Sequence, residues 1–297
     1  SGKHKITSFE TTPIMSSYLL AFVVGEMHSV EGKTERGVLM RSWSTVAHPK
    51  KTLQHANDQA IRTIEFFESY FSTPFPLKKC DQVALPDFDA GAMENWGLIT
   101  YREIALLTDP DNKSISSEHY VAMVIAHELS HQWFGNLVTM QWWDDLWLNE
   151  SFAALMEHVA LDKLHPEWMQ WEQYVSDDVL ASSNRDSYQN VQPVRVDVKH
   201  PDEIHTLFDP AIVYAKGGRL LKMLMDYIGE EAFRKGLKEY FDVHKYKNTT
   251  RDDLWTALSN ASGFDVNSFM NPWLEQSGMP LITASHTGKS LHLSQRR

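Results

Sequence analysis

The most constraining feature of this 297-residue chain is the segment His127-Glu128-Leu129-Ser130-His131. On an α-helix, side chains four residues apart project from the same face, so both imidazoles can reach one metal ion. Glu128 lies between them and is placed to act as a general base beside that ion without being one of its ligands. The chain is therefore expected to fold around a helix that carries two metal ligands.

A third ligand is expected because catalytic zinc sites combine three protein ligands with one open coordination position. Glu150 follows His131 after 18 intervening residues, which is enough for a turn and a returning helix. We therefore predict that His127, His131 and Glu150 bind one Zn²⁺ per chain. The alternative, a histidine pair that is only packed or solvated, is disfavoured because burying three ionisable groups without a metal is costly.

Composition restricts the partners and the compartment. The formal net charge is −11, so neither nucleic acid nor an anionic membrane surface, which both require basic patches, is expected as a partner. No apolar run approaches the roughly 20 residues of a membrane helix, and no membrane segment is predicted. The single cysteine, Cys80, cannot form an intrachain disulfide, which favours a reducing, cytoplasmic location.

Hydrophobic periodicity predicts a β-rich beginning followed by helices. Strands are predicted within residues 6–30, including a buried strand at 17–24, and at 37–46, 82–85, 98–101 and from 281 onward. Helices are predicted from residue 52 to before Pro74 and at about 116–134, 148–164, 220–228, 232–244 and 254–261. The chain is thus expected to be α+β, mostly helical after a small β region.

Taken together, these motifs resemble the gluzincin aminopeptidase family, which includes aminopeptidase N, the puromycin-sensitive aminopeptidase and leukotriene hydrolase. The upstream segment Gly91-Ala92-Met93-Glu94-Asn95 narrows the resemblance to the aminopeptidase N family, and the similarity covers nearly the whole chain. It implies a thermolysin-like catalytic domain with β remnants of neighbouring domains at both ends. The expected ranges are 1–33 for the last strands of an N-terminal β domain, 34–272 for the catalytic domain, and 273–297 for a linker and the start of a following β domain.

The resemblance also implies roles for the segment at residues 91–95 and for Tyr214. The segment would bind substrate, with Glu94 holding the free α-amine of a peptide, and Tyr214 would donate a hydrogen bond to the oxyanion of the tetrahedral intermediate. A fixed carboxylate suits an exopeptidase because substrates without an α-ammonium group leave it buried and unpaired. We therefore expect a zinc-dependent aminopeptidase acting on peptides with free N-termini, with Glu128 as general base.

Two departures from the family pattern are visible. The family has a second amine-binding carboxylate in the N-terminal β domain, outside residues 1–33, so this chain is expected to bind zinc yet cleave substrates poorly by itself. The aspartate that orients a histidine ligand in thermolysin-type enzymes corresponds to Ala154 here. Asn149 or Glu157 is expected to take over that contact.

Three alternatives remain open at this stage. A zinc endopeptidase or an epoxide hydrolase could share the same zinc ligands, although an endopeptidase has no use for Glu94. A catalytically inactive binding module would keep the fold but would have no need of Glu128. The segment at residues 91–95 resembles the plain aminopeptidases more closely than leukotriene hydrolase, which favours the aminopeptidase.

Overall fold

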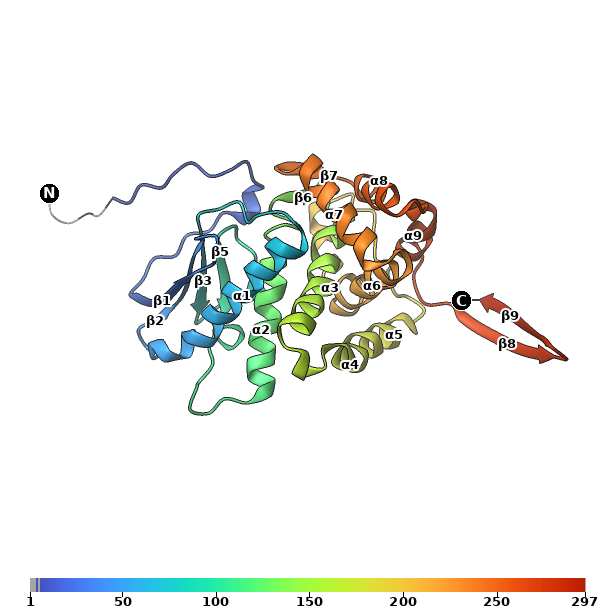
Figure 1. Cartoon of the computed structure of the whole chain (residues 1–297), viewed down its shortest axis with the longest axis horizontal. Coiled ribbons are helices and arrows are strands. Elements are labelled where there is room, and N and C mark those ends of the chain that lie inside the picture. Colours follow the sequence, from blue (N-terminus) through green and yellow to red (C-terminus); the bar gives the residue numbers. More distant parts are fainter. Residues whose placement is uncertain (1–3, 5, 297) are drawn as a thin grey trace.

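The computed structural model describes residue 4 and residues 6–296 of the chain. A sheet lies beside a body of helices, and a two-stranded hairpin extends from the C-terminal end of that body (Figure 1). Residues 1–3, Lys5 and Arg297 lie outside the described residues, and so do the outer ends of the predicted ranges 1–33 and 273–297.

The sheet has five strands: β1 (Met27–Lys33), β2 (Leu39–Thr45), β3 (Lys79–Leu85), β4 (Ala92–Met93) and β5 (Leu98–Arg102). Helix α1 (Gln54–Tyr70) packs on β1 and β2. The strand order is β1-β2-β3-β5-β4. β2, β3 and β5 run parallel to one another, whereas β1 and β4 are antiparallel edge strands. Along β2 buried and half-buried residues alternate, because successive side chains of a strand point to opposite faces.

Helices form most of the remaining body. They are α2 (Ile115–Ser130), α3 (Trp147–Leu164), α4 (Gln170–Tyr174), α5 (Leu180–Asp186), α6 (Gly217–Ile228), α7 (Glu230–His244), α8 (Arg251–Ser262) and α9 (Val266–Glu275). α3 is the central helix: every residue from Trp147 to Leu161 is buried, and α2 and α6 pack directly on it. Apolar residues are therefore found all around this helix rather than on one face.

Two small sheets complete the structure. β6 (Val138–Met140) pairs in parallel with β7 (Lys247–Thr249), and β8 (Leu281–Thr287) pairs with β9 (Ser290–Arg296) as an exposed antiparallel hairpin (Figure 1). Within residues 4 and 6–296, no helix combines the length and the apolar character needed to cross a bilayer.

The predicted α+β class, mostly helical after a small β region, is confirmed. The helices and strands predicted from residue 37 onward are present within about one helical turn of their predicted bounds. The helix predicted at 116–134 begins after Ser114, because the Ser114 and Ser117 side chains each accept a hydrogen bond from the other's backbone amide. It ends at Ser130 rather than at Phe134.

The buried strand predicted at residues 17–24 is wrong. Ser17–Leu19 forms a single 3-10 turn, and no strand appears before β1 in the described residues. Leu19 is buried, but Leu20, Phe22 and Val24 are exposed. The continuous apolar run at 18–24 is typical of a buried strand, yet within the described residues no neighbouring strand pairs with it, and a strand needs such a partner for its backbone groups.

Helices α7 and α8 pack closely against each other at Gly236. A Cβ atom at this position would lie 2.7 Å from Leu258 Cδ2 and 3.0 Å from Leu258 Cα. The second contact is with backbone, so rotation of the leucine side chain would not relieve the clash. The close packing of these two helices therefore requires glycine at residue 236.

We predict that Gly236→Ala lowers the free energy of unfolding by about 1–3 kcal/mol, because overpacking outweighs the better helix propensity of alanine. Urea denaturation followed by circular dichroism measures the change. Gly25→Ala is the matched control, since the nearest atom to a Cβ there is Met27 Cγ at 3.9 Å. Equal stabilities for the two variants would show that α7 and α8 can separate without cost.

Candidate metal centre

Helices α2 and α3 bring His127, His131 and Glu150 around one point. The Nε2 atoms of the two histidines are 3.1 Å apart, and Glu150 Oε2 lies 3.4 Å from the Nε2 of His127 and 3.2 Å from that of His131. The two histidines sit on one face of α2, where a spacing of four residues places them. Among the described residues, this is the one group of three or more His, Cys, Asp or Glu side chains whose ligand atoms converge, all within 4.8 Å of one another.

Hydrogen bonds at the outer ring nitrogens fix the orientation of both histidines. His127 Nδ1 lies 2.6 Å from Glu157 Oε2, and His131 Nδ1 donates to the carbonyl oxygen of Phe134 at 3.0 Å. With Nδ1 donating, each imidazole in its neutral form presents a lone pair at Nε2 toward the same point beside the Glu150 carboxylate. Two imidazole nitrogens and one carboxylate oxygen facing one another form a donor set that fits Zn²⁺.

From the sequence, either Asn149 or Glu157 is expected to orient a histidine of the site, and in the structure Glu157 lies against His127. This glutamate lies two helical turns after Glu150 on α3, so both carboxylates face α2 from the same side of the helix. The amide of Asn149 instead lies toward Gly135 and the hydroxyl of Tyr18. Of these two residues, Glu157 is therefore the one that contacts His127.

The buried charged groups of the site shift one another's pKa values. Burial opposes the negative charge of Glu150, but His131 and His127 outweigh it and lower its pKa to about 2. Burial also opposes the positive charge of His131, but Glu94 and Glu150 raise the pKa of its imidazole to about 9. For Glu128 burial dominates over the two histidines and raises the pKa to about 8. Its Oε2 is buried without a hydrogen-bond partner among the described residues, as suits a group that accepts and releases a proton.

The segment Gly91-Ala92-Met93-Glu94-Asn95 borders this centre. Ala92 and Met93 form the edge strand β4, so the segment is not the simple turn that its Gly and Asn residues favour. The Glu94 side chain is buried, and its pKa is raised mainly by burial and by the charge of Glu150, against the opposing pull of His131. The charges of His131, Glu150 and His127 therefore act on Glu94 as well as on one another.

Two residues that the sequence analysis did not single out hold Glu94 in place. Gln132 Nε2 and Asn136 Nδ2 donate to the Glu94 carbonyl oxygen at 3.2 and 2.8 Å. Gln132 also accepts from the Gly97 amide at 3.2 Å, so it spans the segment. A sequence signal for Gln132 was present, because it follows Glu128 by four residues within the range 116–134 in which a helix was predicted, although α2 itself ends at Ser130. Asn136 lies beyond the helix and gave no periodic signal.

Tyr214 reaches the centre from a π-helical segment, η8 (Pro210–Lys216), that continues into α6. Its ring stacks near that of His127, with centroids 5.8 Å apart. Burial and the charges of Glu150 and Glu128 raise the pKa of its phenol far above the usual range, so the hydroxyl remains a donor. The structure therefore brings together all the side chains predicted to carry the chemistry.

The position of η8 depends on two tight contacts. A Cβ on Gly217 would lie 1.9 Å from Ser151 Oγ, and Ser151 Oγ donates to the Val213 carbonyl oxygen at 2.6 Å, so η8 lies directly against α3. Lys216 is almost fully buried and donates to Asp186 Oδ1 at 2.9 Å and to the Gly278 carbonyl oxygen at 2.8 Å. A buried ammonium group needs such partners.

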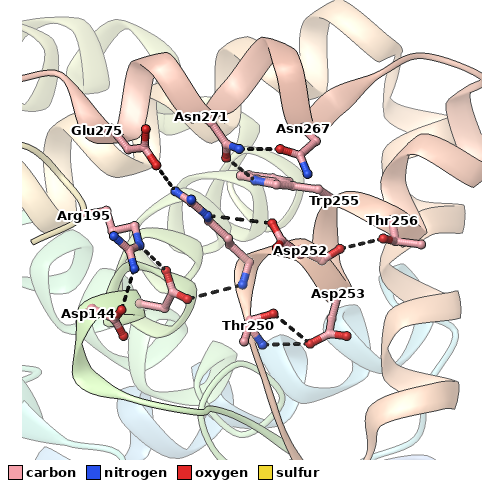
Figure 2. A network of polar contacts seen from close by, with 12 residues as sticks. Asp144, Arg195, Thr250, Asp252, Asp253, Trp255, Thr256, Asn267, Asn271 and Glu275 are labelled. Carbon is pink, nitrogen blue, oxygen red and sulfur yellow. Dashed lines mark hydrogen bonds and ion pairs between the residues drawn. The ribbon is translucent and has the colours of Figure 1, made fainter. Parts of the chain in front are cut away.

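A network of ion pairs fixes the start of α3, three residues before Glu150 (Figure 2). Trp147 Nε1 donates to Asp145 Oδ1 at 3.0 Å, and Arg195 Nε lies 3.4 Å from the same oxygen. Arg251 links this network to α9 through Glu275, at 2.6 Å. The first turn of α3 is thereby tied to α8 and α9.

The family of the chain follows from comparison with known proteins. The sequence model of the peptidase family M1 domain matches residues 55–273. This chain belongs to peptidase family M1. The predicted membership is confirmed, and with it the thermolysin-like α+β fold that the resemblance implied.

Several relatives match almost the whole chain. Aminopeptidase N of Lactococcus lactis subsp. cremoris (strain MG1363) is 56% identical over 289 residues, which cover 97% of this chain and 34% of that protein. Aminopeptidase 2, mitochondrial, of Saccharomyces cerevisiae is 48% identical over 284 residues, covering 96% and 30%. The alanine/arginine aminopeptidase of the same yeast is 47% identical over 293 residues, covering 99% and 34%. This M1 chain thus spans about a third of the length of these curated relatives.

We predict that Glu157→Gln weakens zinc binding by about 10- to 100-fold, because the charged partner that orients His127 is lost. Competition with a chelating dye measures the affinity, and the unaltered protein is expected to bind one zinc per chain. Glu172→Gln, at an exposed position of α4, serves as the matched control. Equal affinities for the two variants would contradict an orienting role for Glu157.

Proposed function

We propose that this M1 chain is the catalytic part of a zinc-dependent aminopeptidase, which hydrolyses the N-terminal peptide bond of peptides. The observation that carries the proposal is the convergence of two histidines and Glu150 with two further buried carboxylates, Glu128 and Glu94, in one site. Each of these groups has a separate task in the hydrolysis of a terminal peptide bond.

His127, His131 and Glu150 would hold the zinc ion, in keeping with the general zinc dependence of family M1. When bound there, zinc supplies a Lewis acid that polarises the carbonyl group of the scissile bond. Glu157 and the Phe134 carbonyl keep both imidazoles in the tautomer that presents Nε2 to the metal.

Glu128 would act as the general base and then as the general acid. Its unpartnered Oε2 takes the proton of the attacking water and delivers it to the leaving amine. Tyr214 stays protonated and donates a hydrogen bond to the carbonyl oxygen as negative charge develops on it. Glu128 is buried and Tyr214 is half-buried, so water screens these interactions less than it would at the surface.

Glu94 would bind the α-ammonium group of the substrate and so restrict cleavage to the first peptide bond. The segment Gly91, Ala92 and Met93 lies at the β4 edge of the sheet, where an extended peptide would pair with the backbone groups that β5 leaves unpaired. An endopeptidase substrate would leave Glu94 buried and unpaired, which disfavours that alternative. The relatives that match almost the whole chain are named aminopeptidases, which favours this activity over an epoxide hydrolase or an inactive binding module.

The wider protein is part of the same proposal. Because the curated relatives are about three times as long as this chain, we propose that flanking domains complete the enzyme. A cytoplasmic location also remains a proposal. It is supported by Cys80, which is buried in β3 as a free thiol.

We predict that Glu128→Gln retains zinc but lowers kcat by about 10²–10⁴-fold, because the amide preserves the shape of the side chain and cannot accept the proton. Steady-state hydrolysis of an aminoacyl substrate and zinc content are measured on the same preparation. More than a tenth of the unaltered activity in a fully zinc-loaded variant would exclude Glu128 as the base.

We predict that Glu94→Gln lowers kcat/KM for a peptide with a free N-terminus by roughly 30-fold or more, because a buried charge pair with the amine is lost. The same peptide with an acetylated N-terminus should be a poor substrate for the unaltered protein. Glu172→Gln is again the control. Efficient cleavage of the acetylated peptide by the unaltered protein would favour an endopeptidase instead.

A further inference from the structure

The chain before β1 touches the body of the protein mainly at one turn. In Figure 1 this dark blue segment extends away from the sheet and helices. Many of its apolar side chains are exposed, among them Ile6, Phe9, Ile14 and Phe22. The exception is η1 (Ser17–Leu19), where Leu19 is 2% exposed and belongs to the main hydrophobic core. The position of η1 therefore matters more than that of the residues around it.

η1 contacts both segments that carry carboxylates of the site. The carbonyl oxygen of Leu19 accepts a hydrogen bond from Asn95 Nδ2 at 3.4 Å, directly after Glu94. The hydroxyl of Tyr18 accepts one from Asn149 Nδ2 at 3.4 Å, directly before Glu150. The Tyr18 ring also lies against Trp143, with centroids 6.1 Å apart.

The body of the protein leaves space for this phenol. Gly135 has φ +121°, a conformation that L side chains rarely adopt, and a Cβ there would lie 3.0 Å from Asn149 Nδ2 and 3.6 Å from the Tyr18 hydroxyl. Glycine at residue 135 thus allows Asn149 and Tyr18 to meet. The contact between Asn149 and Tyr18 therefore depends on the backbone conformation of the turn that follows α2.

The Tyr18 hydroxyl lies next to the segments that carry Glu94 and Glu150, because Asn95 contacts Leu19 and Asn149 contacts Tyr18 itself. Because Asn149 donates to the hydroxyl oxygen, the hydroxyl proton is free to be donated onward. Burial, then the charges of Glu94 and Glu150, raise the pKa of Tyr18 well above its usual range, and a hydrogen bond to Glu94 adds to this. Since Glu150 is the proposed zinc ligand, Glu94 is the acceptor that remains.

We propose that Tyr18 is a positioning residue for the α-amine of the substrate: its hydroxyl donates to the Glu94 carboxylate and holds it toward the amine. This inference rests on the proposed aminopeptidase function and on the role given there to Glu94. Hydrogen bonds to a charged carboxylate are among the stronger ones in proteins, so the loss of this one is expected to be measurable.

The test compares two inhibitors of the zinc-loaded protein, leucine hydroxamate, which has a free α-amine, and acetohydroxamate, which has none. In Tyr18→Phe, binding of leucine hydroxamate should weaken about tenfold, while binding of acetohydroxamate changes less than about twofold. Tyr120→Phe, on α2 with a partly exposed side chain, is the matched control and should change neither. Zinc content and circular dichroism establish that the variants are loaded and folded. Equal weakening of both inhibitors, or of neither, would overturn the inference.

A double-mutant cycle with Glu94→Gln separates this inference from the function on which it rests. If Tyr18 acts through Glu94, adding Tyr18→Phe to Glu94→Gln should weaken leucine hydroxamate by less than about a further twofold. If Glu94→Gln weakens this inhibitor while Tyr18→Phe alone does not, the inference fails and the proposed function stands. If Glu94→Gln leaves the preference for the free amine intact, both fail.

Discussion

The concentration of charge between α2 and α3 is the constraint on which the rest of the structure depends. His127, His131, Glu128 and Glu150 are largely buried together, and Glu94 adds a further carboxylate. Isolated buried charges cost several kcal/mol each, and only mutual pairing and a bound cation offset that cost. The two helices must therefore be held at a fixed separation. The burial of α3 from Trp147 to Leu161, and the hydrogen bond and ion pair that Asp145 makes at its first turn, provide this rigidity.

Hydrogen bonds and packing against these helices also fix the orientation of most side chains in the site. Both imidazoles are fixed at Nδ1, Glu94 is fixed through its backbone, and η8 is packed against α3 at Gly217. Glu128 is the exception, since one of its oxygens has no partner in the described part of the chain. A group that exchanges protons benefits from this freedom, whereas groups that define geometry do not.

The sequence predicted correctly those features that depend on the periodicity of helices and strands. The spacing of His127 and His131 on one helix, and a returning helix with Glu150, are local properties that α2 and α3 reproduce. The prediction failed at residues 17–24 because an apolar run indicates a buried strand but says nothing about whether a partner strand exists. The contacts of Gln132, Asn136 and Tyr18 bridge distant parts of the chain. No local pattern specifies such partners, and a single sequence therefore could not reveal them.

The buried ammonium group of Lys216 has a mechanical consequence. It holds Asp186, and it also holds the backbone at Gly278, where the chain leaves α9 toward the exposed hairpin of β8 and β9. Two residues before Lys216, the same segment carries Tyr214. The segment that leads to the hairpin and the segment that carries Tyr214 are thus joined through the ammonium group of Lys216. A force applied to the hairpin is transmitted to the segment that presents Tyr214 through this group.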